Sequence, residues 1–137
     1  MTNMTPIQAD APCPCGHALR YADCCGRFHV HAGPMHLKAP DAPTLMRSRY
    51  TAYVLGLTDY LSATWHPSTR PATLAPDSPG VRWLGLEVRR AVQQDDDHAT
   101  VEFVARSKLG GCAHRLHEVS RFVREDGRWL YVDGDIR

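Results

Sequence analysis

Residues 13–26 of the chain read Cys-Pro-Cys-Gly-His-Ala-Leu-Arg-Tyr-Ala-Asp-Cys-Cys-Gly and contain four of its five cysteines. Core packing does not call for such a density of cysteine. Thiolates are zinc ligands, and closed structural sites hold Zn²⁺ between four ligands in a tetrahedron. The spacing therefore predicts a structural zinc site made by Cys13, Cys15, Cys24 and Cys25.

Disulfide bonds are the main alternative for these cysteines. Cys24 and Cys25 are adjacent and Cys13 and Cys15 are one residue apart, so neither pair suits the usual bridge geometry. A bridge from Cys13 to Cys24 would leave the other two unpaired. Residues 1–11 contain neither a basic n-region nor an apolar h-region. We therefore expect a cytoplasmic protein whose reduced thiols favour metal binding.

The segment between the cysteine pairs is expected to be helical. His17–Asp23 is long enough for about two helical turns, which would return the second pair to the side of the first. Four thiolates give a zinc site a net charge of about −2. Arg20 and Arg27 lie where they would either offset this charge or form ordinary solvated surface.

Length and composition indicate one globular domain with a small appendage. The chain has 137 residues, and 43% of them are hydrophobic. The body of the chain can bury its own core, whereas the cysteine segment needs its metal to fold. The formal net charge of +1 supplies no field that would attract nucleic acid, and no apolar run approaches the ~20 residues of a membrane span. Nucleic acid and membrane partners are thus disfavoured.

Two helices are predicted after the breaker-rich residues 33–40. The first begins near Asp41, has Pro43 in its first turn and ends at Gly56. Its apolar face repeats at steps of three and four residues: Met46, Tyr50, Tyr53 and Leu57. Thr58 or Asp59 is expected to cap a short second helix that extends to Trp65 and stops at Pro67.

The second half of the chain changes to the period of strands. Residues 83–89 alternate, with Leu84, Leu86 and Val88 on one face, and residues 101–106 alternate in the same way. A long strand is predicted over residues 114–124, after a turn at Gly110-Gly111. Asp126-Gly127 is a strong hairpin signal before residues 129–133. Helices followed by successive antiparallel strands predict an α+β fold.

These motifs together resemble a known family. Residues 13–16, Tyr21 and residues 24–26 are similar to the SEC-C zinc motif, which is named for the C-terminal tail of the SecA translocase. The downstream segments Leu-Met-Arg-Ser-Arg-Tyr at 45–50, Thr-Trp-His-Pro at 64–67, Val-Glu-Phe-Val-Ala at 101–105 and Arg128-Trp129 to Asp133-Gly134 resemble the bacterial YchJ-type family. One departure is His17-Ala18, which stands where SEC-C motifs usually carry Ser-Gly.

The resemblance implies a particular domain organisation. That family joins an N-terminal SEC-C motif to an NTF2-like cone, in which helices pack on a curved antiparallel sheet around a pocket, and it has no settled activity. We therefore expect a flexible leader at residues 1–11, a zinc module at residues 12–38 and the NTF2-like domain at residues 39–137. The SEC-C likeness also implies contact with another protein.

The concave face of such a cone offers candidate pocket residues: Tyr50, Trp65, His66, Trp83, Glu118, Ser120, Arg121 and Asp133. In a functional interpretation His66 is a general acid or base that Glu118 or Asp133 orients. In a structural interpretation Glu118 and Arg121 form an ion pair while the tryptophans fill the core.

Several other residues have a structural and a functional interpretation. Arg47 and Arg49 would either contact an acidic partner or form a solvated helix face. His29, His31 and His36 are expected to pack the zinc module against the main domain rather than to replace a cysteine ligand. Cys112 is expected to be a small turn residue.

The leading hypothesis is a cytoplasmic zinc-binding protein that acts as a small protein-interaction or adaptor module, because four protein ligands leave no open metal position for catalysis. The alternative is an NTF2-like small-molecule binder or enzyme that uses an acid–base pocket around His66. An open pocket would favour the alternative, and a pocket plugged by Trp65, Trp83 and Phe103 would count against it.

Overall fold

The computed structural model describes residues 7–30, 33–74 and 80–137. The N-terminal part holds a 3₁₀ turn at Tyr21–Asp23 and the short helix α1 at Gly26–His29. The long helix α2 spans Ala42–Leu55, and α3 spans Thr58–Ala63. Four strands follow in order: β1 at Arg82–Gln93, β2 at His98–Leu109, β3 at Cys112–Glu125 and β4 at Arg128–Ile136. This order of helices and then strands confirms the predicted α+β class.

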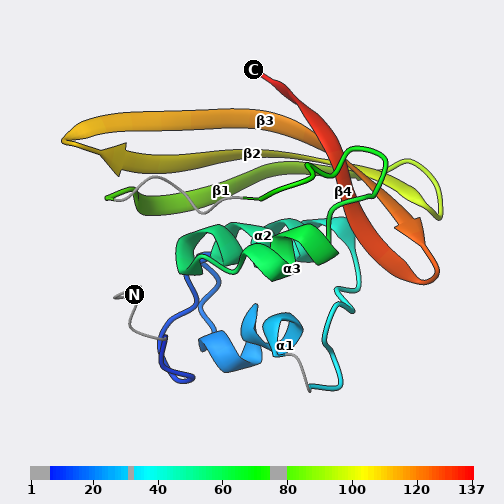
Figure 1. Cartoon of the computed structure of the whole chain (residues 1–137), viewed down its shortest axis with the longest axis horizontal. Coiled ribbons are helices and arrows are strands. Elements are labelled where there is room, and N and C mark those ends of the chain that lie inside the picture. Colours follow the sequence, from blue (N-terminus) through cyan, green and yellow to red (C-terminus); the bar gives the residue numbers. More distant parts are fainter. Residues whose placement is uncertain (1–6, 31–32, 75–79) are drawn as a thin grey trace.

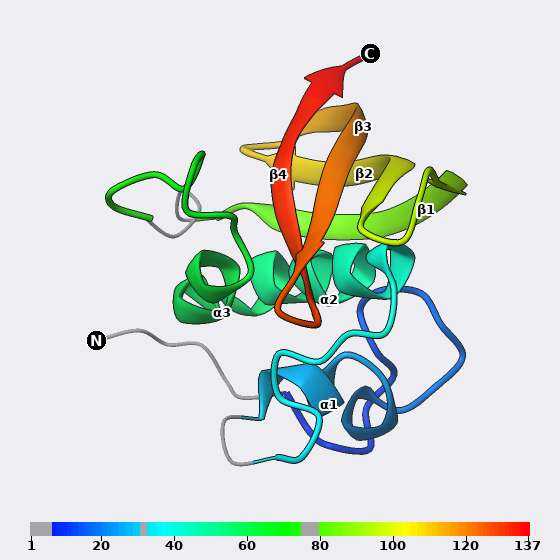
Figure 2. The ribbon, with the colours of Figure 1, turned by 90° about the vertical axis from the view of Figure 1, so that its right-hand side faces the viewer.

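The elements form three layers (Figure 1). The curved sheet is the first layer, α2 and α3 cover one of its faces, and the cysteine-containing segment with α1 lies on the far side of α2. A view from the side shows β4 crossing over the end of the sheet toward the helices (Figure 2). Helix α2 is therefore the central element, because it contacts the sheet with one face and the N-terminal layer with the other.

Local sequence explains where α2 begins and ends. The side chain of Asp41 accepts a hydrogen bond of 2.9 Å from the backbone N–H of Thr44, which caps the helix, and Pro43 lies in the first turn. Gly56 ends it in a left-handed conformation, with φ of 72°. Helix α3 is shorter than predicted, because it ends at Ala63 and leaves Trp65 outside.

The sheet is an antiparallel meander in the order β1-β2-β3-β4. Both predicted tight turns are present, since Gly110 and Gly111 join β2 to β3 and Asp126 and Gly127 join β3 to β4, all with positive φ. Long strands with this twist curve around the helices (Figure 2). The apolar face of the sheet packs on α2 through residues such as Val101, Phe103 and Phe122.

β1 does not follow the simple alternation expected from its sequence, because its pairing with β2 is irregular. The pairing with β2 shifts between Trp83 and Gly85, so Leu84 is an extra residue in the ladder. Trp83 consequently turns toward the core, and Leu84 is 53% exposed. The alternation predicted that Leu84 would share a face with Leu86, which packs against the core. A bulge reverses the face of every residue on one side of it, and the amino-acid pattern does not reveal its position.

The chain just before the first cysteine is hydrogen-bonded to the 3₁₀ turn that precedes the second cysteine pair. Backbone N–H groups of Tyr21 and Ala22 donate to the carbonyl oxygens of Ala11 and Ala9 at 2.8 and 3.0 Å. Of the leader predicted at residues 1–11, residues 1–6 lie outside the described residues. In the described part of the chain, no helix has the length and apolar character needed to cross a membrane.

Candidate metal centre and cavity

The four clustered cysteines converge on one point. Their sulfur atoms all lie within 4.8 Å of one another, and the Sγ atoms of Cys15 and Cys24 are 3.6 Å apart. A disulfide requires about 2.05 Å between sulfurs, whereas four ligands at about 2.3 Å from a tetrahedral zinc ion are about 3.8 Å apart. All four side chains are buried. The arrangement thus fits a metal ion and does not fit disulfides.

The backbone reaches this geometry by turns and not by the predicted two-turn helix. Residues 21–23 form a single 3₁₀ turn, and the chain before them runs back along residues 11–13, where the Cys13 N–H donates to the Leu19 carbonyl at 3.0 Å. Gly26 permits the close return that follows, because a Cβ there would lie 2.6 Å from the Tyr21 carbonyl oxygen. The Cys-Cys-Gly sequence therefore needs its glycine for space.

Ionisation of the cluster also points to a cation. Hydrogen bonds from the Cys15 and Cys25 thiols lower the pKa of Cys13. Burial raises the pKa of Cys24 to about 12, and hydrogen bonding with Cys13 raises the pKa of Cys25. One thiolate is thus favoured by its neighbours, while further thiolates repel one another in a buried space. Four thiolates can coexist here only around a positive ion.

Polar neighbours surround the sulfurs. Thr51 Oγ1, from α2, donates to Cys25 Sγ at 3.4 Å, and His17 Nδ1 lies 3.7 Å from Cys24 Sγ. His17 is the residue that departs from the usual SEC-C pattern, so the departure places a ring nitrogen beside a ligand. Arg27 donates to the Cys24 carbonyl at 3.1 Å, whereas Arg20 forms an exposed pair with Asp23.

The cysteine layer rests on α2 through specific contacts. Arg47 Nη1 donates to the Cys15 carbonyl at 2.9 Å, which corrects the expectation of a solvated helix face. His29 Nε2 lies 2.9 Å from the Ser48 carbonyl oxygen, and its Nδ1 lies 2.7 Å from the Tyr21 hydroxyl. Burial lowers the pKa of His29, which favours a neutral ring that donates from Nε2 to the Ser48 carbonyl and accepts at Nδ1 from the Tyr21 hydroxyl. His29 therefore ties α1 to α2, as expected; His31 lies outside the described residues.

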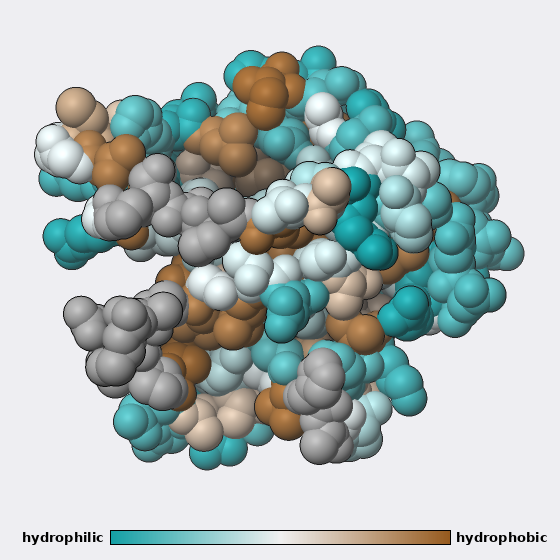
Figure 3. Space-filling model, in the orientation of Figure 1, coloured by the Kyte–Doolittle hydropathy of each residue, from teal (hydrophilic) through white to brown (hydrophobic). Residues whose placement is uncertain are grey.

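The opposite face of α2 closes a cavity of about 250 Å³ beneath the sheet. Most of its wall is apolar and comes from α2 and from β1, β2 and β3: Met46, Tyr50, Trp83, Phe103, Ala105, Leu116 and Phe122. Figure 3 shows apolar side chains at a hollow below the sheet. Trp83 and Phe103 form part of the wall and leave the cavity open. An apolar cavity with a few polar groups is typical of a small-molecule site.

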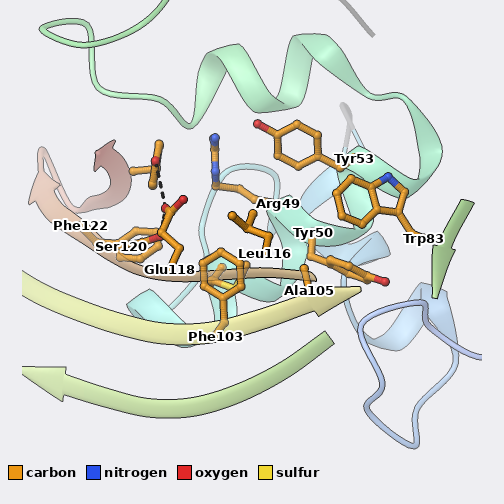
Figure 4. A pocket seen from close by; sticks show the side chains of 12 residues that line it. Arg49, Tyr50, Tyr53, Trp83, Phe103, Ala105, Leu116, Glu118, Ser120 and Phe122 are labelled. Atoms are coloured by element: carbon orange, nitrogen blue, oxygen red, sulfur yellow. Dashed lines mark hydrogen bonds between the residues drawn. The ribbon is translucent and has the colours of Figure 1, made fainter. Parts of the chain in front are cut away.

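One end of the cavity is polar. It is formed by Arg49, Tyr53, Glu118, Ser120 and Tyr131. Figure 4 shows Arg49 from α2 and Glu118 from the sheet reaching into the same space. Ser120 Oγ donates to Glu118 Oε2 at 2.5 Å, and the Tyr131 hydroxyl donates to the same oxygen at 3.2 Å. The two predicted aromatic residues Tyr50 and Trp83, together with Glu118 and Ser120, are therefore brought together here.

Arg121 and Asp133 lie on the other face of the sheet, which corrects their predicted place in the pocket. Arg121 neighbours Ser120 on β3 and so points the opposite way, where it pairs with Asp133 and Asp135. The pairing of β3 with β4 shifts between Arg121 and Phe122. This bulge turns Tyr131 inward and Asp133 outward, although they are two positions apart and simple alternation would give both the same face.

His66 is likewise outside this cavity and bonds neither Glu118 nor Asp133, so the predicted acid–base pair is not formed; with Arg121 and Asp133 it lines a second, more open hollow. Its backbone N–H donates to the Tyr131 carbonyl at 2.8 Å, beside the edge of β4. Its Nε2 lies 2.8 Å from Glu125 Oε2, and its Nδ1 accepts from the Ser68 N–H at 3.1 Å. Ser68 Oγ is also 2.7 Å from Nδ1. These bonds close the turn at Pro67.

Like Tyr53 and Tyr131, Arg49 is a residue of this site that was not predicted to line the pocket. It is 5% exposed, and its Nη1 donates to the Leu61 carbonyl at 2.9 Å and to Thr64 Oγ1 at 2.7 Å. Trp65, which was predicted to line the pocket, instead lies behind Arg49, with its ring centre 5.1 Å from the guanidinium carbon. The period of α2 provided a signal, since Arg49 falls between Met46 and Tyr53 on the apolar face.

Comparison with known proteins identifies the family. The family model described as the middle NTF2-like domain of YchJ matches residues 41–134. The chain belongs to the YchJ family. A UPF0225 protein of Bordetella parapertussis is 60% identical over 132 residues, which cover 96% of this chain and 98% of the relative. A UPF0225 protein of Methylibium petroleiphilum is 62% identical over 128 residues, or 93% and 90% of the two chains.

Two solved structures have the same fold as this YchJ-family chain. One is the solution structure of a SEC-C motif containing protein from Rhodopseudomonas palustris, with a TM-score of 0.74 and 33% identity over 90% of this chain and 96% of that one. The other is the crystal structure of a SEC-C motif containing protein from Psychrobacter arcticus, with a TM-score of 0.76 and 28% identity over 94% and 84%. The expected NTF2-like fold with an N-terminal SEC-C motif is thereby confirmed.

The position of Glu118 yields a prediction about Gly134. A Cβ at position 134 would overlap the Glu118 carboxylate, so Gly134→Ala must displace that side chain from Ser120 and Tyr131. We expect urea denaturation to show a loss of about 1–3 kcal/mol of unfolding free energy. Gly134→Ala in a Glu118→Ala background is expected to cost much less, because the overlapping atoms are gone. Equal costs in the two backgrounds would show that Glu118 does not occupy this space.

Proposed function

We propose that the protein holds one structural Zn²⁺ through Cys13, Cys15, Cys24 and Cys25, and that its NTF2-like cone binds a small molecule. Support for zinc comes from sulfur positions that match a tetrahedral site and from the SEC-C likeness. Four thiolates would complete the coordination of the ion, so the metal is assigned no catalytic step. Its role would be to fold a segment that is too small to fold alone.

The observation that carries the proposal is the open cavity on the other side of α2. Thr51 and Ser48 on one face of the helix contact the cysteine layer, while Tyr50 and Arg49 on the other face line the cavity. A metal that orders the layer would therefore hold α2 against the sheet and preserve the shape of the cavity. We infer that the zinc module supports the ligand site from behind.

We also propose that the protein works in the cytoplasm. Thiolate ligands must stay reduced to bind zinc, and a reducing compartment maintains this state. The exposed Cys112 would also stay reduced there.

The zinc proposal predicts one zinc per chain in the purified protein, measured by elemental mass spectrometry. Cys25→Ser should lose the metal and lower the melting temperature by more than about 4–8 °C, since removal of a structural metal costs more than 1 kcal/mol. Cys112→Ser is the matched control, because Cys112 is exposed at the start of β3 and is not one of the four clustered cysteines, and it should keep both zinc and stability. A folded wild-type protein without metal would contradict the proposal.

The cavity proposal predicts that small aromatic fragments bind under the sheet. Ala105→Phe should abolish this binding, because Ala105 is buried in the cavity wall and a phenyl group there would fill the space. Ala113→Phe is the control, since Ala113 is exposed near the far end of β3. Ligand-observed NMR with a fragment library would measure the difference. Fragments that bind all three proteins equally would exclude the cavity as the binding site.

Protein interaction through the cysteine module is a second candidate function. The module exposes large apolar side chains, since Leu19 is 49% and Val30 is 54% exposed. Exposed apolar surface is a feature of interaction sites when it forms a contiguous patch. The SEC-C likeness supports a protein partner for this surface.

Surface variants that leave the cysteines intact would test this second candidate. We expect affinity capture from bacterial lysate with the intact protein to retain a stoichiometric partner that Leu19→Ser with Val30→Ser loses. Leu84→Ser is the matched control, because Leu84 is equally exposed but lies on β1. A partner retained by all three proteins would place the interaction elsewhere.

A further inference from the structure

The polar end of the cavity holds two opposite charges that do not pair with each other. Arg49 and Glu118 both line it, yet no carboxylate among residues 7–30, 33–74 and 80–137 lies within 4.0 Å of a guanidinium nitrogen of Arg49. The ion pairs present lie on the outer surface and at the strand edges. A buried charge without a counter-charge is costly, so its retention needs a reason.

In the described part of the chain, only neutral groups hold Arg49 in place. Its guanidinium carbon lies 5.1 and 4.7 Å from the ring centres of Trp65 and Tyr131, which also pack edge-to-face on each other, and Nη1 donates to the Leu61 carbonyl and Thr64 hydroxyl. Those two bonds leave the N–H groups of Nε and Nη2 for the cavity and for the hydroxyl of Tyr53 beside it. A planar fork with free N–H groups is the usual partner of a carboxylate.

Hydrogen bonds from two hydroxyl groups hold Glu118 in place. Ser120 and Tyr131 both donate to Oε2, and the missing side chain of Gly134 leaves room for the carboxylate. In the described part of the chain no hydrogen bond ends on Oε1, which leaves this oxygen free to accept a donor. Tyr131 contacts both charges, since its ring stacks on Arg49 and its hydroxyl bonds Glu118. The two charges thus share one side chain as a common neighbour.

We propose that the cavity binds a small zwitterion with an apolar body, of the class of an apolar α-amino acid, whose carboxylate meets Arg49 and whose ammonium group meets Glu118. This inference rests on the proposed small-molecule function and specifies its ligand class. A simple anion would be repelled by Glu118, and a simple cation would be repelled by Arg49. A molecule that carries both charged groups on one carbon satisfies each of them.

The rest of the cavity suits the body of such a ligand. Tyr50, Trp83, Phe103 and Leu116 form apolar walls beyond the polar end. The cavity volume is about 250 Å³. Since a cavity of about 150 Å³ accommodates one benzene ring, this space holds a ring together with an amino-acid head group. Aromatic walls also favour stacking with an aromatic side chain.

A series of three ligands tests the proposal on the zinc-loaded, full-length protein. L-phenylalanine carries both charges, 3-phenylpropionate lacks the ammonium group, and phenethylamine lacks the carboxylate. Isothermal titration calorimetry is expected to show the amino acid binding at least about tenfold more tightly than either analogue, because each analogue leaves one charge of the site unpaired. An analogue that binds as tightly as L-phenylalanine would overturn the proposal.

Variants of Glu118 and Arg49 test which charged group of the ligand each residue binds. Glu118→Gln should weaken L-phenylalanine at least about tenfold while leaving 3-phenylpropionate bound as well as, or better than, in the wild type. Arg49→Lys keeps the charge but removes the fork, and should weaken both carboxylates. Glu87→Gln is the matched control, because Glu87 is exposed on β1, and it should change nothing. Wild-type affinities in Glu118→Gln would overturn the role of Glu118 and with it the zwitterion.

The outcomes separate this inference from the function on which it rests. If aromatic fragments bind the wild type but not Ala105→Phe, and L-phenylalanine binds neither, the cone binds small molecules and the zwitterion class is overturned. If neither fragments nor amino acid bind the folded, zinc-loaded protein, both proposals are overturned together.

Discussion

The seating of α2 between the cysteine layer and the sheet is the constraint on which the rest of the structure depends. The two opposite faces of α2 make different contacts. Ser48 and Thr51 meet His29 and the cysteine sulfurs, while Arg49 and Tyr50 face the sheet. The cysteine layer and the cavity wall are therefore joined through this one helix.

Strand β4 also makes several different contacts at the cavity. Tyr131 stacks on Arg49, bonds Glu118 and pairs through its backbone with Thr64 and His66. The bulge that turns Tyr131 inward also sends Asp133 outward to Arg121. One irregularity in one strand therefore sets which charges face the cavity and which face solvent. The cavity keeps a single arginine and a single glutamate, held apart, with aromatic walls beyond them.

Periodicity and turn chemistry were sufficient to predict most elements of the fold. Asp41 and Gly56 mark the ends of α2 because capping is local, and Asp126-Gly127 marks its hairpin because the turn needs positive φ. The pocket residues were predicted less well. Leu84 was assigned to a face by alternation and Asp133 was predicted to line the pocket, and a bulge beside each residue turns it to the other face. His66 lies beside Glu125 because of the turn at Pro67, and no local sequence pattern specifies the direction of that turn.

The sequence by itself determined the cysteine cluster, the order of the elements and the family, because cysteine spacing, caps and turns act over a few residues. Only the tertiary structure decided that Arg49 is buried rather than solvated, and that Glu118 rather than Asp133 shares its cavity. The physical reason is that burial of a charge depends on which distant segments fold over it. For Arg49 these segments are Leu61–Trp65 and Tyr131, which lie far away in the chain and meet only when β4 crosses the end of α2.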